Sequence, residues 1–94
     1  MTIGFVGTHY PKPEYFNEFV DRVHRVAAVL ESTAGCLSVA CWISDTGDAV
    51  VSTALFESDE ALNESFSAVL AADVDVNFDD RELKPRSVLK LLPR

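Results

Sequence analysis

The stretch GCLSVACWISDTGDAVVSTALF, residues 35–56, holds two apolar, β-branched runs on either side of a polar turn. Val, Ile, Trp and Thr are typical strand residues, and each run has the usual length of a strand. Between the runs, Asp45-Thr46-Gly47-Asp48 supplies turn residues, including a glycine that is free to adopt a positive φ. The stretch therefore predicts a β-hairpin with strands over 35–44 and 49–56.

Two amphipathic segments flank this hairpin. Residues 14–31 repeat apolar side chains every three or four positions, which predicts an α-helix whose start is marked by the prolines at 11 and 13. After the hairpin, Ser58 followed by two acidic residues is typical of a helix N-cap. The first helix is expected to bury a stripe of Phe16, Phe19, Val20, Val23, Val26, Ala27 and Leu30. The second is expected to bury Ala61, Leu62, Phe66, Val69 and Leu70. The charged residues Glu18, Asp21, Arg22 and Arg25 are expected to point away from the stripe of the first helix.

Two further strands are expected at the ends of the chain, over Ile3–Tyr10 and Val88–Leu92. The resulting order is βαββαβ, which is the ferredoxin-like arrangement of the α+β class. We therefore expect a single domain, residues 1–94, with a four-stranded antiparallel sheet. Both helices should cover one face of this sheet and leave the other face open.

Charge and composition exclude several functions. The net charge of −7, from 15 acidic and 8 basic side chains, disfavours binding to nucleic acid or to anionic membrane surfaces. No apolar run approaches the roughly twenty residues that span a bilayer, and the N-terminus lacks the features of a signal peptide. Two cysteines without an export signal indicate reduced thiols, so the expected location is the cytoplasm.

The two cysteines are expected to pack rather than to bind a metal. Cys36 and Cys41 are five residues apart, so on a regular strand their side chains point to opposite faces and cannot share a metal ion or a disulfide. The chain has no Cys-x-x-Cys motif, and neither histidine completes a zinc set by its spacing.

The same alternation sorts the hairpin into two faces. Leu37, Val39, Cys41 and Ile43 with Val50, Ala54 and Phe56 would face the helices, and Ser38, Ala40 and Trp42 with Val51, Thr53 and Leu55 would face the open side. That open face is mostly apolar, and an exposed apolar surface of this size usually marks an interface or a ligand groove. We therefore expect a homodimer in which two open faces meet around a pocket for a small apolar or aromatic ligand.

Residues 73–80 (DVDVNFDD) begin like a calcium-binding loop. Phe78 stands where that loop needs glycine, and Lys84 stands where it needs a bidentate glutamate. We therefore expect an acidic surface connection, whose Val74, Val76 and Phe78 could close one end of the barrel.

Three stretches carry a family resemblance: Lys12-Pro13 after the first strand, residues 34–38 (AGCLS) entering the second, and residues 56–62 (FESDEAL) leading into the second helix. They resemble the antibiotic-biosynthesis-monooxygenase-like (ABM) family of the dimeric α/β barrel superfamily, and with the element order the likeness covers nearly the whole chain. It implies a homodimer whose sheets close into a barrel around a small cavity. Some relatives oxidise phenols and quinols with molecular oxygen and no metal or organic cofactor, and others degrade haem.

The chain departs from the family pattern at several positions. Relatives often carry a glutamate on the third strand, a tryptophan at its end and a histidine in the second helix, where this chain has Ala54, Phe56 and Ser65. The asparagine of the haem-degrading branch corresponds to Val6. Haem degradation is therefore not expected, and the usual acid–base groups of the family are missing.

Five residues are candidates for the site. The resemblance favours Thr8 and Tyr10 in the cavity, and a one-residue shift of the alignment would place Phe5, Gly7 and His9 there instead. The further ligand-binding candidates are Trp42 as a wall of the pocket and Thr53 as a residue that orients polar groups; both belong to the expected open face. Trp42 also fits a second interpretation, in which it packs across the dimer interface. His9 is the candidate catalytic residue, because imidazole titrates near neutrality and could act as a general base if it faces the pocket; a surface position at the end of the strand is the alternative.

The leading hypothesis is a cofactor-independent monooxygenase that acts on a small phenol- or quinol-type substrate. The alternative is a non-catalytic dimer of the same fold that binds or senses a small molecule. A third possibility is a structural dimerisation domain whose cavity is filled by its own side chains.

Overall fold

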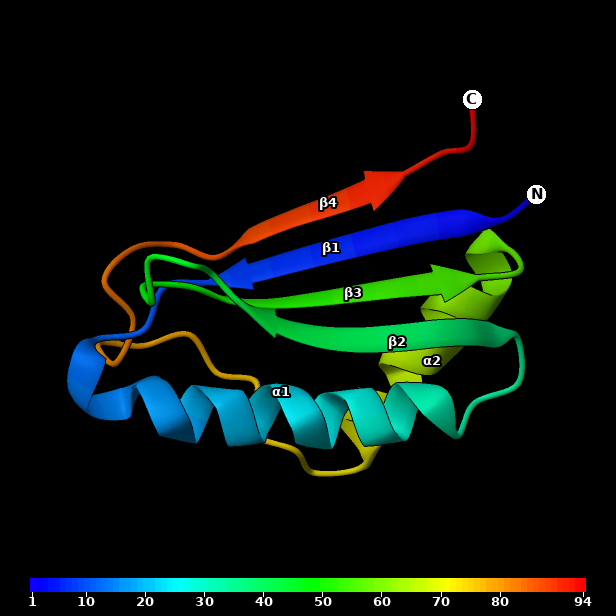
Figure 1. Ribbon diagram of the computed structural model, residues 1–94. Coiled ribbons are helices and arrows are strands. Elements are labelled where there is room, and N and C mark those ends of the chain that lie inside the picture. Colours follow the sequence, from blue (N-terminus) through cyan, green and yellow to red (C-terminus); the bar gives the residue numbers. More distant parts are fainter.

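The computed structural model describes all 94 residues and follows the predicted order of elements (Figure 1). The elements are β1 (Ile3–His9), a 3-10 turn η1 (Pro13–Tyr15), α1 (Phe16–Glu31), β2 (Cys36–Ile43), β3 (Val50–Phe56), α2 (Asp59–Ala71) and β4 (Ser87–Leu91). Each predicted helix and strand is confirmed to within a few residues at its ends.

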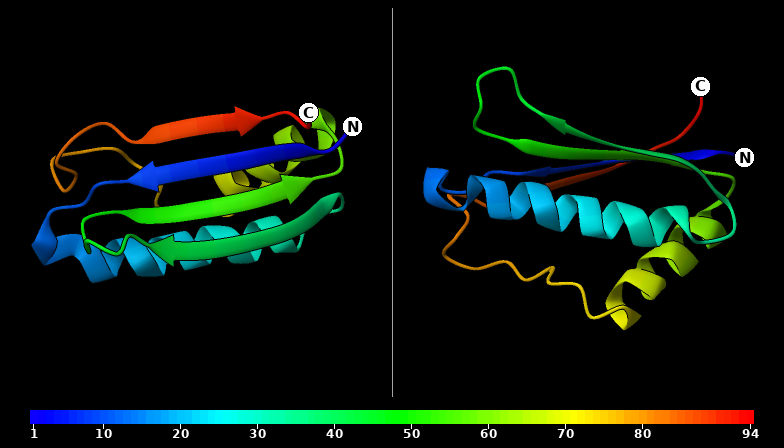
Figure 2. Two further views of the ribbon diagram at one scale, coloured as in Figure 1. Left: turned by 45° about the horizontal axis from the view of Figure 1, so that its top comes forward. Right: turned by 60° about the horizontal axis from the view of Figure 1, so that its bottom comes forward.

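The four strands form one antiparallel sheet in the order β2-β3-β1-β4. Figure 2 shows both helices on one side of this sheet, while its other side carries no chain segment. This arrangement confirms the ferredoxin-like α+β fold. The closed barrel of two chains stays a prediction.

The β2–β3 hairpin has the expected register over most of its length. Trp42 lies opposite Val51 and Ala40 opposite Thr53, so these residues share the open face as predicted. Gly47 in the turn adopts a φ of +77°, which a glycine reaches without steric strain. The sequence therefore predicted the turn and the face assignment correctly in this half of the hairpin.

The expected placement of the cysteines on opposite faces is wrong. The register shifts between Cys36 and Ser38, so Cys36 lies opposite Phe56 and Cys41 opposite Ser52. Both partners belong to the helix-facing set of β3, so both cysteines lie on the helix side. The two partners are four residues apart on β3, or about 13 Å. This distance, rather than opposite orientation, separates the two thiols, and both are free.

The bulge also corrects the position of Leu37. Its side chain is 53% exposed instead of packed against the helices, because the extra residue of a bulge lies outside the regular alternation of the strand. Ile43, also expected to pack against the helices, is 60% exposed at the end of β2. The remaining helix-facing residues of the hairpin belong to two clusters, one around Phe56 and Leu30 and one around Phe19 and Val50.

Two predictions about the helices need correction. Arg22, expected in solvent, is only 3% exposed, because it borders the apolar stripe of α1 and the chain after α2 covers it. Leu70, expected in the core, is 72% exposed at the C-terminal end of α2, where no other segment covers it. Ser58 caps α2 as predicted and accepts a hydrogen bond of 3.1 Å from the Ala61 backbone N–H.

Candidate functional site

A pocket of about 270 Å³ lies between the sheet and the helices, on the side opposite the open face. Its walls come from β1, β3, α1, α2, β4 and residues 76 and 86 of the α2–β4 connection (residues 72–86). The lining is mostly apolar: Phe5, Val23, Val26, Leu30, Phe66, Val69, Leu70, Val76 and Val88. The polar side chains in the lining are His9, Arg22, Ser52, Arg86 and Ser87.

His9 is the last residue of β1, and its ring lines this pocket. Its Nδ1 lies 3.4 Å from Oε1 of Glu82, slightly beyond the usual range of about 2.7–3.2 Å for N–H···O hydrogen bonds. The His9 side chain is 15% exposed, and the Glu82 side chain is fully buried. A carboxylate only accepts hydrogen bonds, so the neutral imidazole carries its proton on Nδ1. The other ring nitrogen, Nε2, therefore keeps a free lone pair.

Glu82 reaches His9 because the α2–β4 connection pairs with the chain that follows β1. The backbone N–H of Lys12 donates to the Arg81 carbonyl at 2.8 Å, and that of Leu83 donates to the Tyr10 carbonyl at 2.7 Å. These two bonds flank Glu82 and hold its side chain beside the end of β1. The pairing joins residues 73 positions apart in the sequence.

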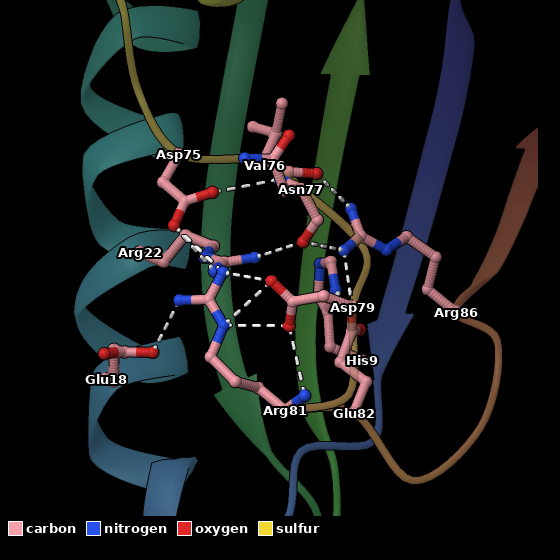
Figure 3. A network of polar contacts seen from close by, with 10 residues as sticks. All are labelled: His9, Glu18, Arg22, Asp75, Val76, Asn77, Asp79, Arg81, Glu82 and Arg86. Carbon is pink, nitrogen blue, oxygen red and sulfur yellow. Dashed lines mark hydrogen bonds and ion pairs between the residues drawn. The ribbon is translucent and has the colours of Figure 1, made fainter.

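Arg86 holds the second oxygen of the same carboxylate. Its Nη2 donates to Oε2 of Glu82 at 2.6 Å and to the Asn77 carbonyl at 3.0 Å, and its Nη1 donates to the Val76 carbonyl at 2.9 Å. Glu82 therefore joins His9 and Arg86 at one end of the pocket. Figure 3 shows this group with the neighbouring ion pairs.

Arg22 fastens the connection to α1 from the other side. Its Nη1 donates to the Asn77 carbonyl at 2.9 Å, and its Nη2 donates to Asp75 Oδ2 at 3.1 Å. Arg81 donates to the same Asp75 oxygen at 3.1 Å and to Glu18 at 2.9 Å (Figure 3). The acidic connection expected from the sequence is therefore tied down by arginines, and Val76 packs into the pocket wall.

Burial lowers the pKa of His9 below its usual value of 6.5, and the positive charge of Arg86 lowers it further, whereas Glu82 acts in the opposite direction. The imidazole is therefore neutral at pH 7. A neutral histidine with one nitrogen bonded to a carboxylate has the arrangement of a general base, because its imidazolium form would be stabilised by that carboxylate.

The other four candidate residues do not line this pocket. Thr8 and Thr53 lie on the open face, where the indole Nε1 of Trp42 donates to Thr53 Oγ1 at 3.1 Å. Tyr10 follows the end of β1, and the ammonium of Lys84 lies 4.2 Å from the centre of its ring. Their ligand-binding roles stay predictions, and they concern the expected cavity between two chains rather than this pocket.

Glu82, Arg86 and Arg22 were not among the residues expected in the site. Arg22 follows Phe19 by three positions and precedes Val26 by four, a helical spacing that could have placed it at the pocket. Glu82 and Arg86 lie in a connection without periodicity, so only their contacts in the folded chain reveal them.

No group of three or more His, Cys, Asp or Glu side chains lies close enough together to hold a metal ion. The helices are also not long and apolar enough for any of them to cross a membrane.

Solved structures share this fold along the full chain. Rv0793 from Mycobacterium tuberculosis matches with a TM-score of 0.85 at 19% identity, covering 100% of this chain and 96% of that one. A conserved protein from Methanosarcina mazei Go1 matches with a TM-score of 0.87 at 12% identity, covering 100% of this chain and 94% of that one. A variant of SnoaB, a cofactor-independent oxygenase from Streptomyces nogalater, matches with a TM-score of 0.75 at 13% identity, covering 99% of this chain and 93% of that one.

At these identities the likeness concerns the fold. No curated protein matches the sequence. Residues 2–70, which are most of the chain, match the family described as "Antibiotic biosynthesis monooxygenase". The chain therefore belongs to the antibiotic biosynthesis monooxygenase family.

Proposed function

We propose that this protein is a monooxygenase that oxidises a small phenol- or quinol-type compound with molecular oxygen, without a metal or organic cofactor. The observation that carries the proposal is the His9–Glu82 pair at the end of an apolar pocket. Membership of the family supports the reaction class.

In the proposed reaction, Nε2 of His9 removes the proton of the phenolic hydroxyl. The resulting imidazolium is stabilised by the Glu82 carboxylate. The distance of 3.4 Å between His9 Nδ1 and Glu82 Oε1 should shorten when the ring becomes charged. The positive charge of Arg86 stabilises the phenolate oxygen. The apolar walls exclude water, which strengthens these charge interactions in the pocket.

The electron-rich phenolate then reacts with dioxygen at a ring carbon that carries hydrogen. One oxygen atom enters the ring as a carbonyl, and the other leaves as water. All the electrons that reduce dioxygen come from the phenol, so the products are a quinone and water. The reaction therefore balances without an external reductant.

The test is oxygen uptake with 1-naphthol in buffer that contains a metal chelator. His24, which is exposed on α1, offers a matched control. His9→Ala should lower the rate by about a hundredfold or more, as expected for the loss of a general base, and His24→Ala should not change it. Full activity in His9→Ala would contradict the proposed base. Binding of 1-naphthol without oxygen uptake in the wild type would favour the non-catalytic binding or sensing dimer.

We also propose that two chains pair through their open sheet faces. Four large apolar side chains on this face are exposed: Trp42 (59%), Leu55 (39%), Leu89 (54%) and Leu91 (47%). A second copy offers the same apolar surface and would cover it. The two free thiols suit the reducing cytoplasm, which we propose as the location.

Light scattering should give twice the chain mass of 10.3 kDa. Trp42→Asp should shift the protein to the monomer, because it brings a charge into the interface. Phe78→Asp, at a 52% exposed position of the connection, should leave the dimer intact. A wild-type monomer at micromolar concentration would overturn this part of the proposal.

A further inference from the structure

Gly7 lies in the part of the pocket wall that the sheet provides, and it contributes no side chain there. β1 is an inner strand that pairs with β3 on one side and β4 on the other, so that Gly7 lies opposite Ser52 and Val88. All three residues line the pocket, as do Phe5 and His9, which are the next residues of β1 on the same face. Gly7 therefore leaves a gap between the side chains of Phe5 and His9.

The backbone of β1 does not require a glycine at this position. The glycines with a positive φ are Gly35 and Gly47, whereas Gly7 is part of a regular strand, a conformation that any residue adopts. A glycine inside a strand is unfavourable, because it loses more conformational freedom on folding and has no side chain to pack. Such a glycine often marks a place that a ligand approaches closely. The reason for this glycine is therefore to be found in the space around it.

The ring of Phe5 occupies the space next to Gly7. A Cβ on Gly7 would lie 3.1 Å from Cζ and 3.2 Å from Cε1 of Phe5, and 3.2 Å from Oγ of Ser52. The two distances to Phe5 are shorter than the roughly 3.5–4.0 Å at which carbon atoms pack best. The missing side chain thus allows the Phe5 ring to lie against β1.

A side chain at position 7 would push the Phe5 ring into the pocket. β1 lies on one side of the ring, and the ring of Phe66 from α2 lies at a centroid distance of 4.9 Å. Phe5 also packs against the buried cluster around Phe56. Because these neighbours restrict the ring, the space open to it is the pocket of about 270 Å³ that it lines. A larger side chain at position 7 would therefore leave less room for a ligand.

We infer that Gly7 determines the size of the molecule that the pocket admits, because it allows the Phe5 ring to lie against β1. Gly7 is a specificity-determining residue and takes no part in the proton transfer to His9. The inference rests on the proposed function for the reaction that the pocket serves. Its statement about the space in the pocket is independent of that reaction.

The experiment measures the binding of benzene and naphthalene, which differ in size and lack the hydroxyl group that the proposed reaction needs. NMR titration of the ¹⁵N-labelled protein gives both affinities, and the shifts of the β1 amides locate the binding in the pocket. Gly7→Val should weaken naphthalene by about tenfold or more, because the displaced ring overpacks the occupied pocket. Benzene should lose less affinity. Gly7→Ala should weaken naphthalene in the same direction by a smaller factor, and it replaces Gly7→Val if that variant does not fold.

Two further variants isolate the mechanism. Gly4→Ala is the matched control, because Gly4 belongs to the same strand and its added Cβ would lie 3.1 Å from the Cβ of Leu91, outside the pocket. It should bind both hydrocarbons like the wild type. In the double variant Phe5→Leu with Gly7→Val, a smaller side chain is displaced. This variant should bind naphthalene more tightly than Gly7→Val alone.

No binding of naphthalene to the wild type, or an unchanged affinity in both Gly7 variants, would overturn the inference. Equal losses of benzene and naphthalene would contradict a limit on size. A double variant that binds naphthalene no better than Gly7→Val would contradict the displacement of Phe5. The expected hydrocarbon affinities, together with no oxygen uptake by the wild type with 1-naphthol, would reject the oxygenase and leave this inference standing.

Discussion

Gly35 joins α1 to β2 in a position that allows no side chain, and its replacement by alanine should be among the more destabilising changes in this protein. Its φ is +86°, which costs about 1–2 kcal/mol for a residue with a Cβ. A Cβ at this position would lie 2.6 Å from the Cβ of Ala61 and 3.2 Å from the Cγ of Glu57. Overpacking of this kind costs about 1–3 kcal/mol more.

We therefore expect Gly35→Ala to lower the free energy of unfolding by about 2–5 kcal/mol. Gly47→Ala is the matched control, because Gly47 has a similar φ of +77° and nothing lies within 4 Å of its added Cβ. Its free energy of unfolding should fall only by the backbone cost of about 1–2 kcal/mol. Urea denaturation followed by circular dichroism measures both values.

A double substitution separates the two costs. Ala61→Gly removes the atom that the new Cβ would approach most closely, so the two changes together should cost less than the sum of the single changes. The expected coupling is about 1 kcal/mol or more in favour of the double variant. Equal losses for Gly35→Ala and Gly47→Ala, or strictly additive effects, would refute the steric reasoning.

Three other results are expected. Glu82→Gln should lower the pKa of His9, because it removes the carboxylate that favours the charged ring, and a histidine NMR titration showing an unchanged or raised pKa would contradict this. The unfolding free energy should decrease as the pH falls through about 6.5, because the unfolded chain takes up the proton of His9 before the folded chain does. This pH dependence should flatten in His9→Asn, and an unchanged slope would assign it to other groups. Ser58→Ala should cost about 1 kcal/mol in urea denaturation through loss of the α2 N-cap, and no loss would mean that the cap is replaced by water.

The sequence by itself determined the order and nature of the elements. The hairpin turn at Gly47, the apolar stripe of α1 and the cap at Ser58 are local patterns, and local patterns depend on residues close together in the chain. The match of residues 2–70 agrees with the resemblance seen in short motifs. The sequence did not predict the bulge at Cys36–Ser38, because nothing in the residues of β2 marks where the pairing with β3 shifts by one. It also did not predict the burial of Arg22 or the exposure of Leu70, which depend on the segments that pack around them.

The tertiary structure decided where a site can form. His9 was a candidate from its residue type, but the lowering of its pKa depends on burial beneath the helices and on Arg86, which lies in another part of the chain. Glu82 joins it from 73 residues away, through backbone bonds that no periodic pattern predicts. The sequence can propose a base, whereas its partner and its pKa come from contacts between distant segments, and only the folded chain brings these segments together.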